Sequence, residues 1–239
     1  MGAQLKTSSI MPADWPAPGS IDLTVHDLPH ASSGMEWWYV NAHLSSEDGR
    51  QASMFAAFFR VDTTENGKQK EFSHFLTWSI VDPLQKRFCA HTLLDPKSPI
   101  MALKDLDNGS APRDPRVSRA LREVLAQGRV PLPDRLMQHE GQVRLDALDV
   151  DYDGNTFRKL ADGSYEVRLL SESGREGCRL RFTLEKPIVR HGDDGVVRGL
   201  AGDDMFYYFS PRCRVEGTVT AEGKPFAVSG SGWYDHEFG

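Results

Sequence analysis

The sequence is poor in features that mark several large classes of protein, and each absence excludes a class. It has three cysteines, Cys89, Cys178 and Cys213, whose odd number and wide spacing fit neither a zinc site nor a dense disulfide framework. No run approaches about 18 apolar residues, and the first residues hold no apolar stretch of the signal-peptide kind. We therefore expect no membrane span, reduced thiols and a cytoplasmic location.

Basic clusters and the common nucleotide and hydrolase motifs are lacking as well. The formal net charge is −6 and no basic stripe stands out, so we expect no nucleic-acid partner. There is no P-loop, no dinucleotide fingerprint and no Gly-x-Ser-x-Gly elbow that would supply a serine nucleophile. What remains, 39% hydrophobic and 26% charged residues over 239 positions, is ordinary for a soluble globular domain.

Short apolar runs separated by glycine turns fill most of the chain. Turn signals such as Asp153-Gly154, Asp162-Gly163 and Glu222-Gly223 recur at the spacing typical of antiparallel strands. This pattern predicts an all-β antiparallel barrel or sandwich. The expected strands cover residues 36–45, 52–61, 72–82, 88–94, 147–152, 165–171, 178–185, 206–210, 214–221 and 225–229.

Two segments depart from the strand pattern. Residues 1–20 are rich in proline and are expected to form an irregular leader ahead of one β domain over 21–239. Asp114 and Pro115 signal a helix start, and apolar residues then repeat at helical spacing up to Gly128. We expect one amphipathic helix at about 116–127, in a helical insertion at about 114–137 that lies across the barrel as a lid.

The last ten residues carry the densest cluster of chemically active side chains. If the strand that begins at Pro225 continues, Trp233, Asp235 and Glu237 share one face, because side chains alternate along a strand. Two acids beside an indole can raise a carboxyl pKa, which suits a general acid near neutral pH. The alternative is an edge strand with solvated acids. Consecutive extended residues cannot converge on one ion, so we expect no metal and no cofactor; Asp235, Glu237 and a distant histidine form the less favoured alternative.

A second strand places an acid where an apolar side chain belongs. Glu36 alternates with Trp38, Val40, Ala42 and Leu44, and a carboxylate on such a face needs a partner or a proton. Arg212 could be that partner, for either Glu36 or Glu237.

Other polar side chains fall in apolar strands. His74 alternates with Leu76 and Trp78, as a core histidine or as a ligand-facing one. Tyr207 and Tyr208 point to opposite faces, as core aromatics or with one phenol reaching a ligand.

The ordered pair Glu36-Trp-Trp-Tyr-Val-Asn41 and Trp233-Tyr-Asp-His-Glu-Phe-Gly239 resembles the carotenoid 1,2-hydratase-like, or AttH-like, lipocalin superfamily. This superfamily includes carotenoid and kievitone hydratases and lipocalin-like cyclases and Diels–Alderases of natural-product pathways. The resemblance implies an N-terminal lipocalin-like domain, with a second lipocalin-like domain that lies outside this chain. It also implies a C-terminal domain, a separate fragment or self-association as partner.

The resemblance further implies a hydrophobic small-molecule substrate and cofactor-independent chemistry. We expect a cyclase, isomerase or hydratase acting on a polyene, polyketide or isoprenoid in secondary metabolism; a non-catalytic carrier and a hydrolase are the alternatives. Trp233 replaces the tyrosine of carotenoid hydratases and cannot donate an O–H, which argues against carotenoid hydration itself. The expected catalytic residues are Glu36 and Asp235; those expected to bind or shape the substrate site are Trp37, Trp38, Tyr39, His74, Trp78, Tyr207, Tyr208, Arg212, Trp233 and Glu237.

Overall fold

One curled, almost wholly antiparallel sheet forms the body of the protein. The computed structural model describes residues 11–64, 70–109, 112, 114–199 and 203–239. The first half of the sheet contains β1 (Met35–Ser45), β2 (Gln51–Asp62), β3 (Phe72–Asp82), β4 (Arg87–Leu94) and β5 (Arg135–Leu136). The second half contains β6 (Gln142–Val143), β7 (Asp149–Tyr152), β8 (Asn155–Lys159), β9 (Tyr165–Leu170), β10 (Gly177–Leu184), β11 (Val189–Arg190), β12 (Val196–Val197), β13 (Met205–Ala221) and β14 (Lys224–Phe238).

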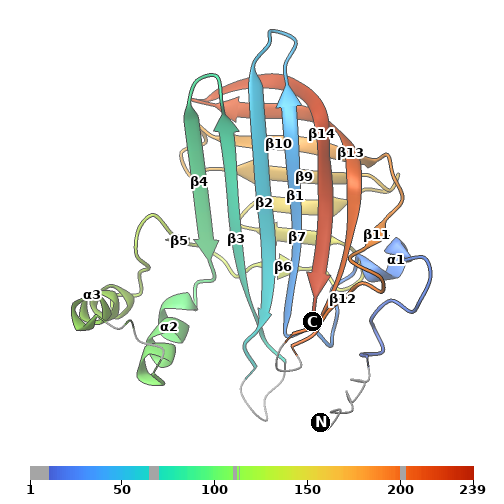
Figure 1. The fold of residues 1–239 in the computed structure, drawn as a ribbon. Coiled ribbons are helices and arrows are strands. Elements are labelled where there is room, and N and C mark those ends of the chain that lie inside the picture. The colour runs from blue at the N-terminus through green and yellow to red at the C-terminus, as the bar shows by residue number, and fades with distance from the viewer. Residues whose placement is uncertain (1–10, 65–69, 110–111, 113, 200–202) are drawn as a thin grey trace, which may run out of the picture.

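The sheet folds over on itself to make two layers. Its hydrogen-bonded order is β5-β4-β3-β2-β1-β14-β13-β10-β9-β8-β7-β6, with β11 and β12 also paired to β13. Figure 1 shows β1 to β4 in the front layer crossing the strands β6 to β10 behind them, while the long β13 and β14 pass from one layer to the other. The result is a half-barrel whose two ends, β5 and β6, are not hydrogen-bonded to each other.

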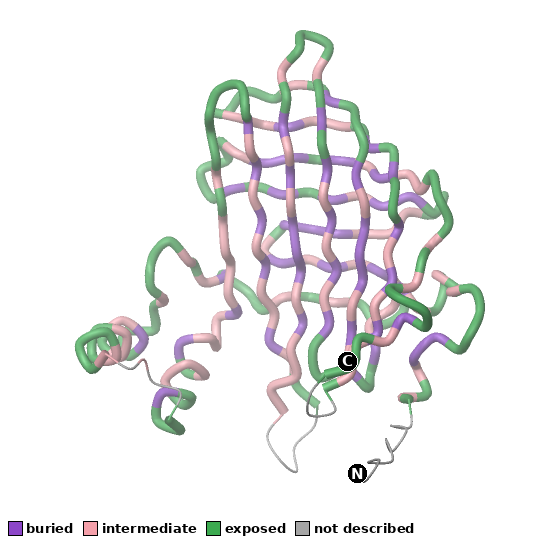
Figure 2. The backbone as a smooth tube through the Cα atoms, in the orientation of Figure 1, coloured by how far each residue is buried: buried purple, intermediate pink, exposed green. Residues whose placement is uncertain are grey.

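Alternation along each strand separates a buried inner face from an outer face. In β1, every second residue from Glu36 to Leu44 is buried, and β2 repeats the pattern from Ala52 to Arg60. Figure 2 shows these buried positions as regular purple bands across the front strands. The core between the layers is aromatic; its largest fully buried side chains are Trp38, Trp78, Tyr152, Tyr165, Tyr208, Tyr234, Phe58, Phe157, Phe182, Phe206 and Phe238.

Strand β13 continues through a position that the sequence reads as a break. The predicted strands 206–210 and 214–221 are one strand, because the pairing with β14 shifts between Ser210 and Cys213 and then resumes. Such a bulge accommodates Pro211, which has no N–H to give to the ladder. β14 also runs unbroken to Phe238, between β1 and β13, so the C-terminal motif lies in the middle of the sheet and not at an edge.

The helices differ from the prediction in number and in place. The expected helix is α3 (Pro115–Leu125), capped by the Asp114 carboxylate, which accepts the Arg116 N–H at 2.9 Å. A further helix, α2 (Ser98–Asp107), was not predicted, although Pro99 in its first turn is a start signal. Figure 1 places both beyond the end of β4, beside the sheet, so the expectation of a lid across the barrel is wrong.

The N-terminal segment packs against the half-barrel. Of the expected leader, residues 1–10 lie outside the described residues, and residues 11–20 form neither helix nor strand. Trp15 is nevertheless buried edge-on against Phe206 and Phe238, with ring centroids 5.8 and 6.0 Å away. A short helix, α1 (Leu23–His26), follows and brings Asp27 and His30 to the inner face of the sheet.

Candidate functional site

The C-terminal motif presents its two acids on the outer face of the front layer. Register pairs Asp235 with Tyr39 of β1, and Glu237 with Trp37 of β1 and Tyr207 of β13. The Tyr207 O–H donates to Asp235 Oδ1 at 2.5 Å, and the Tyr39 and Tyr207 oxygens are 3.2 Å apart. Because the single phenolic proton of Tyr207 goes to Asp235, Tyr39 is the donor to Tyr207. We call Asp235, Glu237, Tyr39 and Tyr207 the acid site.

One oxygen of Asp235 has no partner. Asp235 is 2% exposed, and its Oδ2 atom is buried with no hydrogen bond to any described residue. Burial raises the pKa of Asp235 to about 6, against the opposing effect of the nearby phenols of Tyr207 and Tyr39. Burial, together with the charge of Asp235, raises the pKa of Glu237 to about 7. The site therefore holds two carboxyl groups that exchange protons near neutral pH.

Half-buried aromatic rings surround the acid site on the same outer face. Trp37 lies 5.8 Å from Phe59, which stacks on Phe75 at 4.3 Å, and Tyr39 lies 6.2 Å from Phe55. Trp233 lies beside His43, with centroids 6.0 Å apart. We call this surface the aromatic face; its residues are Trp37, Tyr39, Phe55, Phe59, Phe75, Tyr207, Phe209 and Trp233.

The other predicted acid, Glu36, lies on the inner face, so the two expected catalytic residues are on opposite sides of one sheet. Glu36 is 1% exposed. Arg60 Nη1 donates to its Oε2 at 3.0 Å, while His30 Nδ1 and His236 Nε2 lie 2.8 and 3.0 Å from its Oε1. Burial alone would raise the pKa of Glu36, but hydrogen bonds from His236 and His30 lower it below its usual value.

A second buried carboxylate continues this inner network. Asp27 accepts hydrogen bonds from the phenols of Tyr165 at 2.7 Å, Tyr208 at 2.7 Å and Tyr234 at 3.1 Å, and from Lys159 Nζ at 2.6 Å. These contacts join the N-terminal segment to both layers of the half-barrel. Buried hydrogen bonds in this number are typical of a carboxylate that stabilises the fold.

Three ligand atoms of the inner network could geometrically hold a metal ion. Nitrogen and oxygen atoms of His30, Glu36 and His236 lie within 4.8 Å of one another. Both histidines are hydrogen-bonded to Glu36, and the Arg60 guanidinium beside Glu36 would repel a cation. The donor set therefore fits an ion-pair cluster better than a metal centre.

The remaining predicted residues are distributed over both faces. Trp38 and Tyr208 are buried inside, at 5.1 and 5.2 Å from the His236 ring. His74 and Trp78 are also on the inner face, on β3. Arg212 is a correction: it is exposed, and its Nε donates to Glu185 at 3.0 Å, so it pairs with neither Glu36 nor Glu237. Arg60 takes the role that was predicted for Arg212.

Sequence reasoning missed Asp27, His30 and Arg60. For Arg60 a signal existed, because it alternates with Phe58 and other apolar residues along its strand. Glu36 occupies an apolar row of the neighbouring strand in the same way. Asp27 and His30 lie in a connecting segment, where no periodicity indicates which side chains turn inward.

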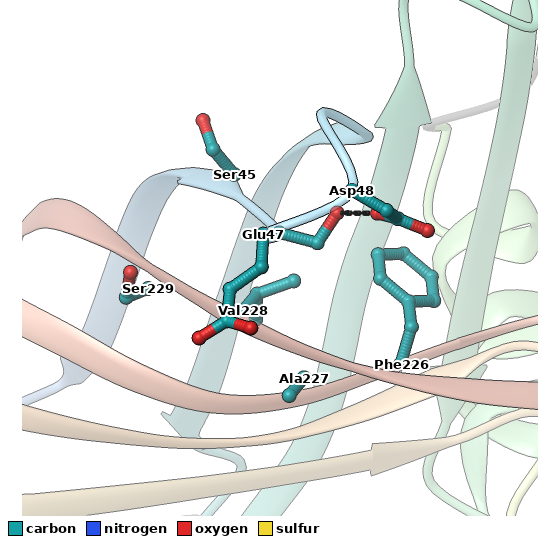
Figure 3. A pocket seen from close by; sticks show the side chains of 8 residues that line it. Ser45, Glu47, Asp48, Phe226, Ala227, Val228 and Ser229 are labelled. Carbon is teal, nitrogen blue, oxygen red and sulfur yellow. Dashed lines mark hydrogen bonds between the residues drawn. The ribbon is translucent and has the colours of Figure 1, made fainter.

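Two hollows of the described surface lie away from the acid site. One, of about 340 Å³, is bounded by the β1–β2 turn and β14, and Figure 3 shows Glu47, Asp48 and Phe226 around it. Its lining combines the acidic side chains of Glu47 and Asp48 with Phe226 and Val228, and it includes no residue of the acid site. No described helix has the length and apolar character needed to cross a membrane.

Comparison with known proteins agrees with this architecture. A family model described as AttH-like matches residues 16–239. The fold is similar to a crystal structure of a candidate AttH protein from Nitrosomonas europaea, with 19% identity, a TM-score of 0.64, and 95% of this chain and 58% of that one covered. It is also similar to kievitone hydratase from Nectria haematococca, with 14% identity, a TM-score of 0.54, and 89% and 50% covered.

No curated protein matches the sequence. The solved relatives establish the lipocalin-like all-β fold that the sequence predicts. The chain spans 58% and 50% of the length of these two relatives.

Proposed function

The chain belongs to the AttH-like family, and from that premise we propose that it is an enzyme of acid–base chemistry on hydrophobic alkenes. The favoured reaction is addition of water to a carbon–carbon double bond of a polyene, isoprenoid or polyketide-derived substrate. Isomerisation and cyclisation share its first step, protonation of the alkene. One of the two solved relatives reported above is a hydratase.

The observation that carries the proposal is the unpartnered oxygen of Asp235. A buried carboxyl oxygen without a hydrogen bond is costly unless something else occupies or protonates it. With a pKa of about 6, Asp235 carries a proton part of the time at neutral pH. The adjoining aromatic face offers an apolar surface against which a hydrophobic substrate can lie.

The two carboxyl groups have complementary roles in the proposed reaction. Asp235 gives its proton to one alkene carbon, and the electron pair of the double bond forms the new C–H bond. The resulting carbocation lies against the aromatic face, whose rings stabilise positive charge. Water adds to the cationic carbon, and its surplus proton goes to the Glu237 carboxylate.

The pKa order sets how often the pair is ready to react. A single proton on the pair lies mostly on Glu237, whose pKa is about 7, and roughly one time in ten on Asp235, whose pKa is about 6. This minor form, with Asp235 protonated and Glu237 ionised, is the productive one. Activity should therefore peak between about pH 6 and 7: at lower pH Glu237 is protonated and lost as a base, and at higher pH the proton of Asp235 is lost.

A partner domain completes the proposed site. The aromatic face is open to solvent in this chain, whereas addition of water to a cation requires controlled access of water. The two solved relatives are longer than this chain. We propose that a second lipocalin-like domain, in the same polypeptide or in a partner, covers the aromatic face and closes the substrate pocket.

The test compares Asp235→Asn and Asp235→Ala in the full protein, on a panel of hydrophobic alkenes. Reactions are run in heavy water and in oxygen-18 water, followed by mass spectrometry. Hydration should add one deuterium on carbon and one labelled oxygen per turnover. Asp235→Asn keeps a hydrogen-bond donor but loses the transferable proton, so the rate should fall about 10²–10⁴-fold.

The matched control is Asp146→Asn, an exposed acid whose partner is Arg144. It should leave the rate unchanged, and thermal melts should show that all variants fold. A purely shape-driven cyclisation would lose little rate in Asp235→Asn but much in Asp235→Ala. Full activity in both variants would remove Asp235 from the site. Binding of alkenes without turnover would favour the carrier.

A further inference from the structure

A second cavity lies at the seam where the half-barrel does not close. It measures about 570 Å³ and is bounded by β4 and β5 on one side and by the β7–β8 turn, β8 and β9 on the other. A smaller hollow adjoins it and shares Leu93, Arg135 and Leu170 with it. The exposed ion pair of Arg135 and Glu172 bridges the two sides at this seam. The seam is distinct from the acid site, which lies on the outer face of the front layer.

Two ring nitrogens at the seam have no partner. Trp78 and His91 line the smaller hollow and are register partners on β3 and β4, with their rings stacked at 4.3 Å. Trp78 is 0% exposed, and both Trp78 Nε1 and His91 Nε2 are buried without a hydrogen bond to any described residue. Leaving a buried N–H group unpaired destabilises a protein, so an acceptor atom from a ligand fits this position.

The charges around the seam restrict the ligand. The larger cavity is lined by four acidic side chains, Glu140, Asp151, Asp153 and Glu172, against the two arginines Arg135 and Arg168. This excess of negative charge disfavours an anion. The indole of Trp78 is a neutral donor, and leucines contribute apolar walls.

We propose that the seam is a second ligand site, which takes a neutral apolar molecule that ends in a carbonyl oxygen. The carbonyl accepts hydrogen bonds from Trp78 Nε1 and from His91 Nε2, with the His91 imidazole in the neutral tautomer that carries its hydrogen on Nε2. The apolar part lies along Leu93, Leu136 and Leu170 in the larger cavity. This proposal gives a binding role to Trp78, which the sequence analysis expected at the substrate site but which lies on the other face of the sheet from the acid site.

The test uses prodan, a neutral naphthyl ketone whose fluorescence shifts to the blue in apolar sites, and anilinonaphthalene sulfonate as an anionic probe. Wild-type protein should bind prodan more tightly than the sulfonate. Leu170→Trp, at a position that is 45% exposed, fills the cavity without touching the core and should abolish prodan binding. Trp78→Phe removes the N–H, keeps an aromatic ring and should weaken binding roughly 3- to 10-fold.

Phe88→Leu, which changes an exposed aromatic residue of β4 that lines neither cavity, is the matched control and should leave the prodan Kd unchanged. Thermal melts verify folding, and the indole ¹⁵N–¹H signal of Trp78 should shift on titration of the wild type. Prodan binding retained in Leu170→Trp, or lost in Phe88→Leu, would place the ligand elsewhere and overturn the proposal. Equal or tighter binding of the sulfonate would refute the neutral carbonyl class, and absence of prodan binding would refute the site.

Discussion

Glu36 shows how a single buried charge is made tolerable. Its carboxylate faces the Arg60 guanidinium and two histidines, so the charge is compensated within the core. Such a pair adds little net stability compared with apolar packing, but the loss of one member leaves the other charged and unpaired. Glu36 is therefore expected to contribute mainly to the stability of the fold.

The variant Glu36→Gln tests this account. It keeps the shape, leaves Arg60 without its counter-charge, and should lower the free energy of unfolding by about 3–5 kcal/mol, as measured by urea denaturation. Glu185→Gln, which removes the exposed partner of Arg212, should change it by less than about 1 kcal/mol. Unchanged stability with complete loss of turnover would instead make Glu36 catalytic.

Glu237 should give the protein an unusual dependence of stability on pH. Its pKa is raised to about 7 in the folded state from an ordinary value of 4.5. The folded state therefore binds the proton more tightly, so this contribution to stability is full below pH 4.5 and is lost as the pH rises through about 7.

The variant Glu237→Gln has no proton to lose. Relative to the wild type, its Tm should be higher by about 2–4 °C at pH 8, with a smaller difference at pH 5. Differential scanning calorimetry at both pH values measures this. The same Tm difference at both pH values would show that Glu237 does not titrate as described.

At the scale of elements, the junction of β1 with β14 holds the acid site together. Glycines in β14 allow the two strands to approach closely: a Cβ at Gly230 would lie 2.0 Å from the His43 carbonyl oxygen. Since backbone atoms cannot yield as the end of a side chain can, any larger residue must separate the strands. The same unbroken register that pairs Gly230 with Leu44 also pairs Asp235 with Tyr39.

Gly230→Ala should therefore destabilise the protein by about 1–3 kcal/mol or more, through overpacking against backbone. Amide hydrogen exchange should increase first along β1 and β14. Gly34→Ala is the matched control, because its Cβ would meet only Gly239 O at 3.6 Å, an ordinary contact. Equal effects of the two substitutions would rule out close approach as the reason for glycine at 230.

At the scale of the whole molecule, the aromatic face is the largest feature without a structural explanation in this chain. Half-buried rings across the front of a sheet are typical of a surface that another domain covers. The inner face is filled by core side chains, whereas the outer face holds both titrating acids.

The chain by itself should self-associate through this face. Sedimentation velocity should show a concentration-dependent increase in mass, and Phe75→Lys, at the β3 edge of the face, should suppress it. Leu145→Lys removes an exposed leucine away from the face and should have no effect. Joining a C-terminal lipocalin-like domain should protect Trp37 and Trp233 from acrylamide quenching. The proposal that a second domain covers the aromatic face would be contradicted if the chain stays monomeric and if that domain leaves the quenching unchanged.

The sequence by itself determined what depends on local periodicity. Alternation placed Glu36 in an apolar row and put Trp233, Asp235 and Glu237 on a common face, and glycine turns marked the antiparallel strands. These features depend on neighbours two to four residues away, and the sequence contains that information directly. The helix α3 was predicted for the same reason.

Only the tertiary structure decided which faces meet. The register of β1 with β14 joins residues about two hundred positions apart, and it places Asp235 beside Tyr39 outside and His236 beside Trp38 inside. Local patterns carry no information about this pairing. They could not show that Glu36 and Asp235 lie on opposite faces of the sheet, nor that the partner of Glu36 is Arg60 and not Arg212. A shift of the pairing register by one residue would move the inner side chains of a strand to its outer face. Burial of the aromatic core excludes that shift, but only once both layers are assembled.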